Sequence, residues 1–279
     1  MQKNSSLISI IIPCYNDYRY VEQAINSALN QTHLNKEVIV VDDGSNLDTK
    51  EVLKRLEPKI TKLITQENQG QSKARNIGIE ASEGKYILVL DSDDFFDLSF
   101  CQKAMEIFLN SEDAKLVTCQ ANLLFKDGSS RIFTPNGGGI TDFIFGNSAL
   151  GTSMFKKADW NACGGYDEDM RNGFEDWEFF IRLLKNGGQA VVIPEPLYTY
   201  RKRNYSTTSI ANSKKYELLA YVFNKNKTLY IENFELYTDY LLKLVQKEEI
   251  EKKKKMNSID YKIGTFVLKP FRIIKLFFK

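Results

Sequence analysis

The chain has 279 residues, of which 43% are apolar and 27% charged, and its formal net charge is +2. This composition is typical of a folded soluble protein and excludes a disordered or fibrous chain. The small net charge argues against nucleic acid as a partner. The charge is uneven, because residues 251–279 hold nine basic residues and two acidic ones, while the rest of the chain is acidic. An acidic body with a basic tail is the first hint of function.

The four cysteines lie singly along the sequence, and His33 is the only histidine. This pattern predicts no zinc site, disulfide framework or histidine-rich metal site, and it is typical of reduced thiols in the cytoplasm. The apolar run 7–12 ends at Pro13 and is too short for a signal peptide. No run reaches the roughly 18 apolar residues of a membrane span. We therefore expect a cytoplasmic protein.

Strands and helices are expected to alternate over the first 125 residues. Continuous apolar runs predict buried parallel strands, and apolar residues three or four positions apart predict helices. The expected strands are 7–12, 37–41, 60–65 and 86–90, and the expected helices are 18–30, 48–56 and 72–81. Repeated units of this kind predict an α/β fold with a doubly wound, mostly parallel sheet. Ligands of such sheets bind beyond the carboxyl ends of the strands.

The pattern changes after residue 115. The expected elements are a hairpin of strands 115–125 and 130–133, a helix 174–185, a strand 190–193 and helices 216–230 and 234–255. We predict three parts on this basis. They are an α/β domain over 1–210, a helical extension over 211–256 and a basic tail over 257–279.

Two carboxylates follow the expected strand 86–90. Asp91 and Asp93 lie one residue apart and can converge on one hard divalent cation, Mg²⁺ or Mn²⁺. Such an ion would bridge the phosphates of a nucleotide diphosphate and offset the charge of the leaving group. In one alternative, an aspartate here caps the next helix. In another, the pair belongs to an aspartyl-phosphate phosphatase, although that signature usually occupies the first strand of its domain.

Another acidic pair, Asp42 and Asp43, follows the expected strand 37–41 and precedes Gly44. A carboxylate at a strand end can accept a hydrogen bond from a base or a ribose, and glycine lets the backbone approach closely. Alone, the segment is a generic turn after a strand. It is neither a dinucleotide-binding fingerprint nor a P-loop.

Six short motifs occur in order along residues 6–205. They are Ile11-Ile12-Pro13-Cys14-Tyr15-Asn16, the turn 41–45, Asn68-Gln69-Gly70 with Ala74-Arg75-Asn76, the cluster 90–94, Gly164-Gly165-Tyr166-Asp167-Glu168 and Glu175-Asp176-Trp177. Together they resemble the family 2 inverting glycosyltransferases of the GT-A fold. The resemblance implies a metal-dependent hexosyl- or N-acetylhexosaminyl-transferase that uses a nucleotide diphosphate sugar, a UDP-sugar, and a hydroxyl of a glycan or lipid-linked acceptor in polysaccharide biosynthesis. A non-catalytic relative that only binds nucleotide sugar or glycan is the alternative.

The resemblance also implies roles for residues on the donor side. Pro13, Tyr15 and Asn16 would line the base and ribose, and Asp42 with Asp43 would read the base. Arg75 and Asn76 would close over the nucleotide, and Asp91 and Ser92 would lie by the ribose. Asp93 with Asp91 would bind Mn²⁺ or Mg²⁺.

On the acceptor side, Asp176 looks like the catalytic base, and Glu175 is the alternative. An acceptor hydroxyl is a poor nucleophile at neutral pH, and a positioned carboxylate can take its proton as the new bond forms at the anomeric carbon. The other explanation of these two acids is that they favour the N-terminus of the helix 174–185 through its dipole. The two roles are compatible.

Further residues are assigned by the same resemblance. Arg201 and Arg203 would meet the diphosphate, or else belong to a solvated basic loop; the chain lacks the histidine that many relatives carry a few residues further on. Thr152 and Ser153 would form part of the acceptor wall. Trp177 either stacks on a sugar or packs in the core, and its helical spacing favours packing.

The tail predicts a contact with a membrane surface. From Pro270, a helix would place basic residues on one side and apolar ones on the other. The basic residues are Arg272, Lys275 and Lys279, and the apolar ones are Phe271, Ile273, Ile274, Phe277 and Phe278. With the run Lys252–Lys255, this pattern favours a peripheral anchor on the inner face of the cytoplasmic membrane. The alternatives are packing against the α/β domain or against the partner of a homodimer.

Overall fold

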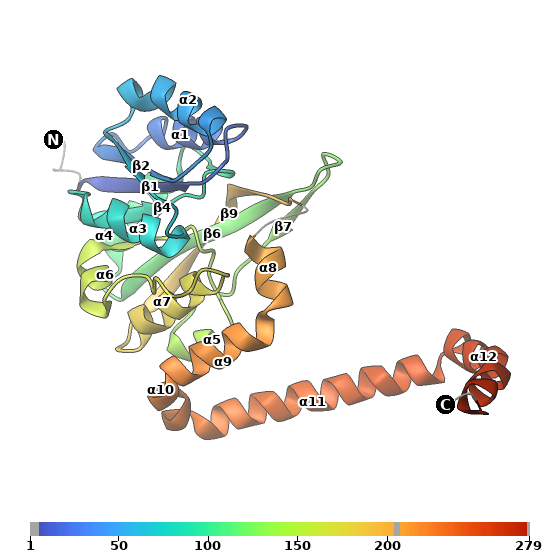
Figure 1. Cartoon of the computed structure of the whole chain (residues 1–279). Helices are drawn as coiled ribbons and strands as arrows, with labels where there is room; N and C mark the ends of the chain where they lie inside the picture. Colours follow the sequence, from blue (N-terminus) through green and yellow to red (C-terminus); the bar gives the residue numbers. More distant parts are fainter. Residues whose placement is uncertain (1–5, 204–206, 278–279) are drawn as a thin grey trace. The chain divides into compact units, whose positions relative to one another are not determined.

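A parallel half-sheet forms the first part of the fold in the computed structural model, which describes residues 6–203 and 207–277 (Figure 1). Its strands, in the order β3–β2–β1–β4, are β3 (Lys62–Gln66), β2 (Lys36–Asp43), β1 (Ile8–Cys14) and β4 (Tyr86–Val89). Neighbouring strands in this half are parallel. Every residue of β1 and β4 is buried, as expected for continuous apolar strands covered on both faces.

Three helices connect these strands: α1 (Val21–Leu29), α2 (Leu47–Leu56) and α3 (Gln71–Glu80), with a 3₁₀ turn, η1 (Glu57–Lys59), after α2. Asn46 caps α2, because its side-chain oxygen accepts from the backbone N–H of Thr49 at 3.1 Å. Gly78 lets α3 pack closely on the sheet, since a Cβ there would lie 2.5 Å from Cγ2 of Ile11. This packing places the first turn of α3 beside the carboxyl ends of the strands.

The second half of the sheet is mixed. The strands β8 (Met154–Lys156), β6 (Ala114–Leu124), β9 (Gln189–Arg201) and β5 (Phe95–Phe96) continue the sheet from β4, and β7 (Ser130–Phe133) pairs with β6. β6 and β9 are parallel, whereas β8 is antiparallel to both of its neighbours. The parallel character expected from the sequence is thus confined to the first half and the β6–β9 pair. The β6–β7 hairpin extends well beyond the body of the sheet (Figure 1).

The remaining helices follow in chain order. In the unit Met1–Asn226 they are α4 (Phe100–Asn110), α5 (Ile140–Phe143), α6 (Lys157–Cys163), α7 (Glu175–Leu184), α8 (Thr207–Ser213) and α9 (Lys215–Lys225), and in the unit Lys227–Lys279 they are α10 (Lys227–Glu232), α11 (Phe234–Asn257) and α12 (Ile259–Phe277). α12 begins well before Pro270, because the chain is already helical after the extended residue Ser258. The sequence predicted that the tail helix begins at Pro270, whereas in the structure it begins at Ile259. The side chains beyond Leu268 lie outside the described part, so the polarity of 270–279 stays a prediction.

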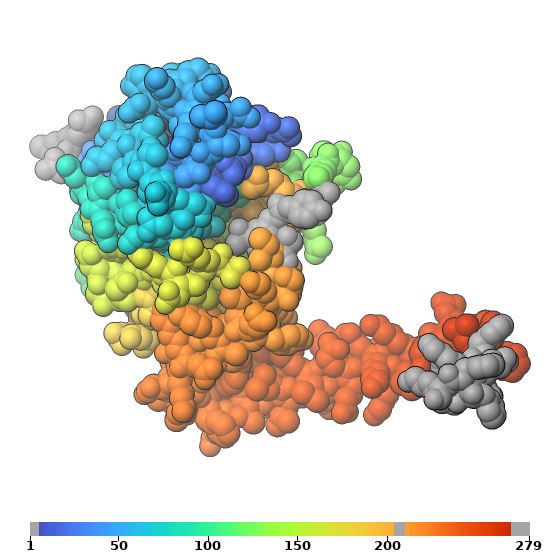
Figure 2. All heavy atoms as spheres, in the orientation of Figure 1, coloured from blue at the N-terminus to red at the C-terminus, as the bar shows by residue number. Residues whose placement is uncertain are grey.

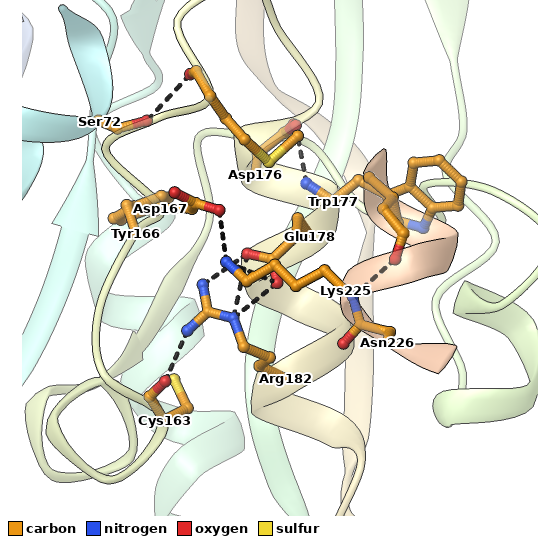
Figure 3. A network of polar contacts seen from close by, with 12 residues as sticks. Ser72, Cys163, Tyr166, Asp167, Asp176, Trp177, Glu178, Arg182, Lys225 and Asn226 are labelled. Atoms are coloured by element: carbon orange, nitrogen blue, oxygen red, sulfur yellow. Dashed lines mark hydrogen bonds and ion pairs between the residues drawn. The ribbon is translucent and has the colours of Figure 1, made fainter. Parts of the chain in front are cut away.

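α7 carries Glu175 and Asp176, the two acids expected on the acceptor side, and it is held by several polar contacts. The indole ring of Trp177 is buried, and its Nε1 donates to the backbone oxygen of Phe143 at 2.6 Å. The next residue, buried Glu178, pairs with Arg182 at 2.6 Å and with Lys225 of α9 at 3.3 Å. Lys225 also pairs with Asp167, so a chain of charges joins α7, α9 and the turn before α7 (Figure 3).

Candidate active site

A cluster of carboxylates lies where the parallel strands end. Asp93, just after β4, pairs with Arg203 through Nη2 at 2.7 Å, and the other Nη of Arg203 pairs with Asp17 at 2.7 Å. The hydroxyl of Ser92 donates to Asp17 at 2.6 Å. One guanidinium therefore joins a residue that follows β1 to a residue that follows β4. Asp17 was not among the residues expected from the sequence.

The turn after β2 is built around Asp42 and Asp43, both of which are buried. Asp42 accepts from the backbone N–H of Ser45 at 2.9 Å. Asp43 accepts from the backbone N–H groups of Gln69 and Gly70 at 2.8 and 2.9 Å, so it fixes the loop that leads into α3. Gly44 allows this approach: it has a φ of 75°, and a Cβ there would lie 2.7 Å from the backbone nitrogen of Asn68.

The loop after β1 meets this turn. Asn16 has a φ of 59°, a left-handed conformation that is uncommon for residues other than glycine. Its side-chain oxygen accepts from the backbone N–H of Asn46 at 2.7 Å, and its own N–H donates to Ser45 at 3.0 Å. Tyr15 is half exposed beside it, and Pro13 is buried within β1. The residues expected to line the base and ribose thus lie together at one edge of the sheet.

Arg75 and Asn76, adjacent in α3, face different partners. Arg75 is almost fully buried and pairs with Asp91 at 2.9 Å and with Glu175 at 2.8 Å. The amide of Asn76 donates to the backbone oxygen of Tyr166 and accepts from the N–H of the same residue, both at 2.9 Å. Asn76 therefore holds the turn before α7 against α3, where the two segments touch on the surface (Figure 2). Its expected contact with nucleotide stays a prediction.

Asp176 lies in the first turn of α7, two residues after Phe174, which has a φ of 65°. Its Oδ2 accepts from the side-chain amide of Asn147 at 2.9 Å, and its Oδ1 accepts from its neighbour's backbone N–H, that of Trp177, at 2.8 Å. A Cβ on Gly151 would lie only 2.7 Å from Oδ2. The carboxylate thus rests on the bare backbone of Gly151, in the segment before β8.

Burial and neighbouring charges raise the pKa values of Asp176 and Asp93. Burial first, and then the charge of Glu175, raise the pKa of Asp176 to about 7, although Arg75 opposes the shift. Burial and then the charge of Asp91 raise the pKa of Asp93, while Arg203 lowers it. A carboxyl group that titrates near neutral pH is suited to general base catalysis.

Arg201 also belongs to this edge, but its contacts differ from those of Arg203. Its guanidinium donates to the backbone oxygen of Asp93 and lies over the ring of Tyr20, 5.0 Å from the centroid. Its backbone N–H donates at 2.7 Å to Asp94, a buried carboxyl group that also accepts from Tyr198. The other expected acceptor residues, Thr152 and Ser153, are buried in the segment that contains Gly151, and Trp177 is packed rather than exposed.

The residues after β4 offer oxygen donors for a divalent cation. Asp91, Asp93 and the nearby Asp17 supply carboxylate oxygens, the donors that Mg²⁺ and Mn²⁺ prefer. Within 6–203 and 207–277 no ready-made group of three or more metal-binding side chains is found. The chemistry of the donor set therefore fits such an ion, and Arg203 supplies the opposite charge to Asp93 in this structure.

Sequence reasoning missed Asp17 and Asn147. They touch the expected residues only through the fold, because they are distant in sequence from Arg203 and Asp176. Gly151 belongs to the stretch expected to form the acceptor wall, but its close approach to Asp176 was not predicted. The glycine before Thr152-Ser153 was the one available signal, since glycine marks places of close approach.

Comparison with known proteins identifies the class. The GT-A glycosyltransferase fold is shared with Staphylococcus aureus TarS 1-349 in complex with UDP-GlcNAc, at a TM-score of 0.60 and 21% identity, covering 72% of this chain and 60% of that one. A mannosyltransferase, PcManGT of Pyrobaculum calidifontis in complex with GDP-Man and Mn²⁺, matches at a TM-score of 0.56 and 18% identity, covering 72% of this chain and 59% of that one.

The family follows from sequence. Residues 9–138 match the model of glycosyl transferase family 2. TuaG of Bacillus subtilis strain 168, named for teichuronic acid biosynthesis, is 30% identical over 209 residues, which are 73% of this chain and 82% of TuaG. The chain belongs to glycosyl transferase family 2. GgaA of the same strain, named a minor teichoic acid biosynthesis protein, is 28% identical over 95% of this chain, yet the chain covers only 61% of GgaA. The chain spans 50% of an uncharacterized glycosyltransferase of Haemophilus influenzae, which is 39% identical over 127 residues and 44% of this chain.

Proposed function

We propose that the chain is an inverting glycosyltransferase. It moves a sugar from a UDP-sugar to a hydroxyl of a glycan or lipid-linked acceptor in polysaccharide biosynthesis. The observation that carries this proposal lies at the carboxyl edge of the parallel strands. There Arg75 joins Asp91, two residues before Asp93, to Glu175 in the first turn of α7. Family membership and the names of TuaG and GgaA support the polysaccharide context.

The donor side is proposed to hold the nucleotide diphosphate. Asp42 lies at the turn that would face the base, and Tyr15 and Asn16 lie beside that turn. Arg203 and Arg201 both contact Asp93, so they are the residues that we expect to meet the diphosphate. The UDP-GlcNAc named with TarS supports a UDP-sugar as donor.

A divalent cation is proposed to complete the donor side. Asp93, together with Asp91, would hold it, and Mn²⁺ is named with the mannosyltransferase PcManGT. When bound, such an ion neutralises charge on the leaving diphosphate. Because Arg203 pairs with Asp93 in this structure, we propose that Arg203 leaves that carboxylate when the cation binds.

The acceptor side is proposed to use Asp176 as the base. Its carboxylate is held by Asn147 and by the N-terminus of α7, so it has a fixed orientation. In the reaction it takes the proton of the acceptor hydroxyl while the oxygen attacks the anomeric carbon and the diphosphate leaves from the opposite face. Glu175 is less suited, because its carboxylate is buried and paired with Arg75.

The test is the substitution Asp176→Asn, which keeps the shape and removes the proton acceptor. We expect donor binding by calorimetry to be unchanged and the turnover number to fall about 10²- to 10⁴-fold. Asp127→Asn, at the exposed tip of the β6–β7 hairpin, is the matched control and should keep full turnover. Unchanged turnover in Asp176→Asn would exclude Asp176 as the base.

The unit 227–279 is proposed to bind an anionic membrane surface. No described helix is long and apolar enough to cross a bilayer. On α12, however, Ile259, Ile263, Phe266 and Val267 are more than half exposed and share one face of the helix. Lys252–Lys255 at the end of α11 add positive charge. Exposed apolar side chains next to lysines are typical of helices that lie in the membrane interface.

Vesicle flotation tests this part of the proposal. The full chain should float with vesicles that contain anionic phosphatidylglycerol and should float less with zwitterionic vesicles. Phe266→Glu should reduce flotation, whereas Leu109→Glu, at an exposed apolar residue of α4, should not. Equal flotation of wild type and Phe266→Glu would contradict the proposal.

A further inference from the structure

Arg75 is expected from the sequence to close over the nucleotide, yet its side chain is buried. Its side chain is 1% exposed, among the largest fully buried side chains of the chain. Removing a guanidinium from water costs several kcal/mol, on the order of the penalty for any buried ion, unless carboxylates compensate it. Two do so here, Asp91 at 2.9 Å and Glu175 at 2.8 Å.

The two partners come from opposite sides of the candidate site. Asp91 follows β4 on the donor side, and Glu175 begins α7, next to the proposed base. The guanidinium also lies over the ring of Tyr166, 5.3 Å from its centroid, in the turn that precedes α7. The guanidinium of Arg75 therefore joins three segments that meet at the candidate site.

We propose that Arg75 is a positioning residue that ties the donor-side carboxylate Asp91 to Glu175, and thereby fixes Asp176 in its orientation and in its ionised form. This inference rests on the proposed function, in which Asp176 is the base. Glu175 then has a defined role: it anchors the first turn of α7 through Arg75 and is not itself the base.

Electrostatics supports the geometry. The charged and titratable groups that face Asp176 are Glu175, Arg75, Asp91 and Tyr166. Burial and the charge of Glu175 raise the pKa of Asp176, and Arg75 is the one cation among these groups that lowers it. Without Arg75, two uncompensated carboxylates would remain beside Asp176, so its pKa would rise further.

The sign of the effect follows directly. A base must be ionised to accept a proton, so turnover rises with pH through the pKa of Asp176. In Arg75→Met the acid limb of the pH profile should move upward by about one pH unit or more. In Arg75→Lys, which restores the positive charge, the limb should return most of the way. In Glu175→Gln, which removes a carboxylate that raises the pKa of Asp176, the limb should move downward.

Arg182→Met provides the matched control. Arg182 is also a largely buried arginine paired with a carboxylate of α7, Glu178, but it does not contact the candidate site. Its loss should lower the temperature of unfolding without moving the pH profile. An unshifted profile in Arg75→Met, with only a uniform loss of turnover, would overturn the inference. If that variant does not fold, an acid limb that does not move downward in Glu175→Gln would overturn it equally.

The inference is also testable without turnover. The carboxyl ¹³C resonance of Asp176, assigned by its loss in Asp176→Asn, reports its titration in the full-length protein. We expect its midpoint to be higher in Arg75→Met than in wild type, and an equal midpoint would overturn the inference. A wild-type protein that transfers no sugar while its Asp176 titrates as described would instead contradict the proposed function and leave the positioning role intact.

Discussion

Gly151→Ala is a substitution whose effect should appear in turnover and not in stability. The added Cβ would lie 2.7 Å from Oδ2 of Asp176 and 3.4 Å from both its Cβ and its Cγ. Favourable contacts between heavy atoms begin at about 3.5 Å, so the carboxylate must move by roughly 0.8 Å. It can do so by rotating, since it is the end of a side chain, but it then leaves the hydrogen bond with Asn147.

The magnitude follows from this displacement. A misplacement of about 1 Å in a reacting group can cost about 10²-fold in rate, so we expect turnover to fall about tenfold to a hundredfold. Loss of the Asn147 hydrogen bond costs about 1 kcal/mol of stability. Replacing glycine by alanine stabilises by about 0.4–1 kcal/mol through the unfolded chain. The two effects nearly cancel, so the free energy of unfolding should change little.

The assay compares the turnover number, the affinity for UDP and the temperature of unfolding in three proteins. Gly146→Ala is the matched control, because a Cβ there meets no atom within 4 Å. It should behave as wild type in all three measurements. Wild-type turnover in Gly151→Ala would refute the placement of Asp176 as a base that needs this exact position, and a large fall in UDP affinity would place Gly151 on the donor side instead.

Three further predictions concern the donor side and pH. Asp93→Ala should abolish the stimulation of nucleotide release by Mn²⁺, as measured with and without chelator, and persistent stimulation would exclude Asp93 as the ligand. Since the pKa of Asp176 is raised to about 7, turnover should fall about tenfold per pH unit below 7, and a profile flat down to pH 5 would contradict its role. Arg203→Met removes the guanidinium that pairs with Asp93 and Asp17. Calorimetry should then show that Mn²⁺ binds the donor-free protein about tenfold more tightly and that UDP binds more weakly. Weaker Mn²⁺ binding would argue against displacement of Arg203.

The donor edge of the fold was predictable from local sequence. The strands β1 to β4 agree with the expected ranges within two residues at each end, because continuous apolar runs bounded by turn residues are a strong signal. Parallel strands bring their carboxyl ends to one edge, so the grouping of Asp42, Asp91 and Asp93 followed from topology alone.

The rest of the fold depends on contacts that no local pattern carries. β5 and β8 have two and three residues, too few to show a period, and their pairing comes from the sheet around them. Tertiary packing likewise brings Asp17 to Arg203 and Asn147 to Asp176. The contact of Asn76 with the turn at Tyr166 is likewise a tertiary one, and its expected contact with nucleotide stays a prediction.

The central claim is that this site transfers sugar from a nucleotide diphosphate sugar with the help of a divalent cation. Release of nucleoside diphosphate should therefore be measured across UDP-, GDP-, dTDP- and CMP-sugars, with Mn²⁺, Mg²⁺ or chelator, and with a mixture of glycan and lipid-linked acceptors. The account predicts release of UDP from one sugar, lost with chelator and in Asp93→Ala. Release that is insensitive to chelator, or no release and no binding of any of these nucleotides, would contradict it.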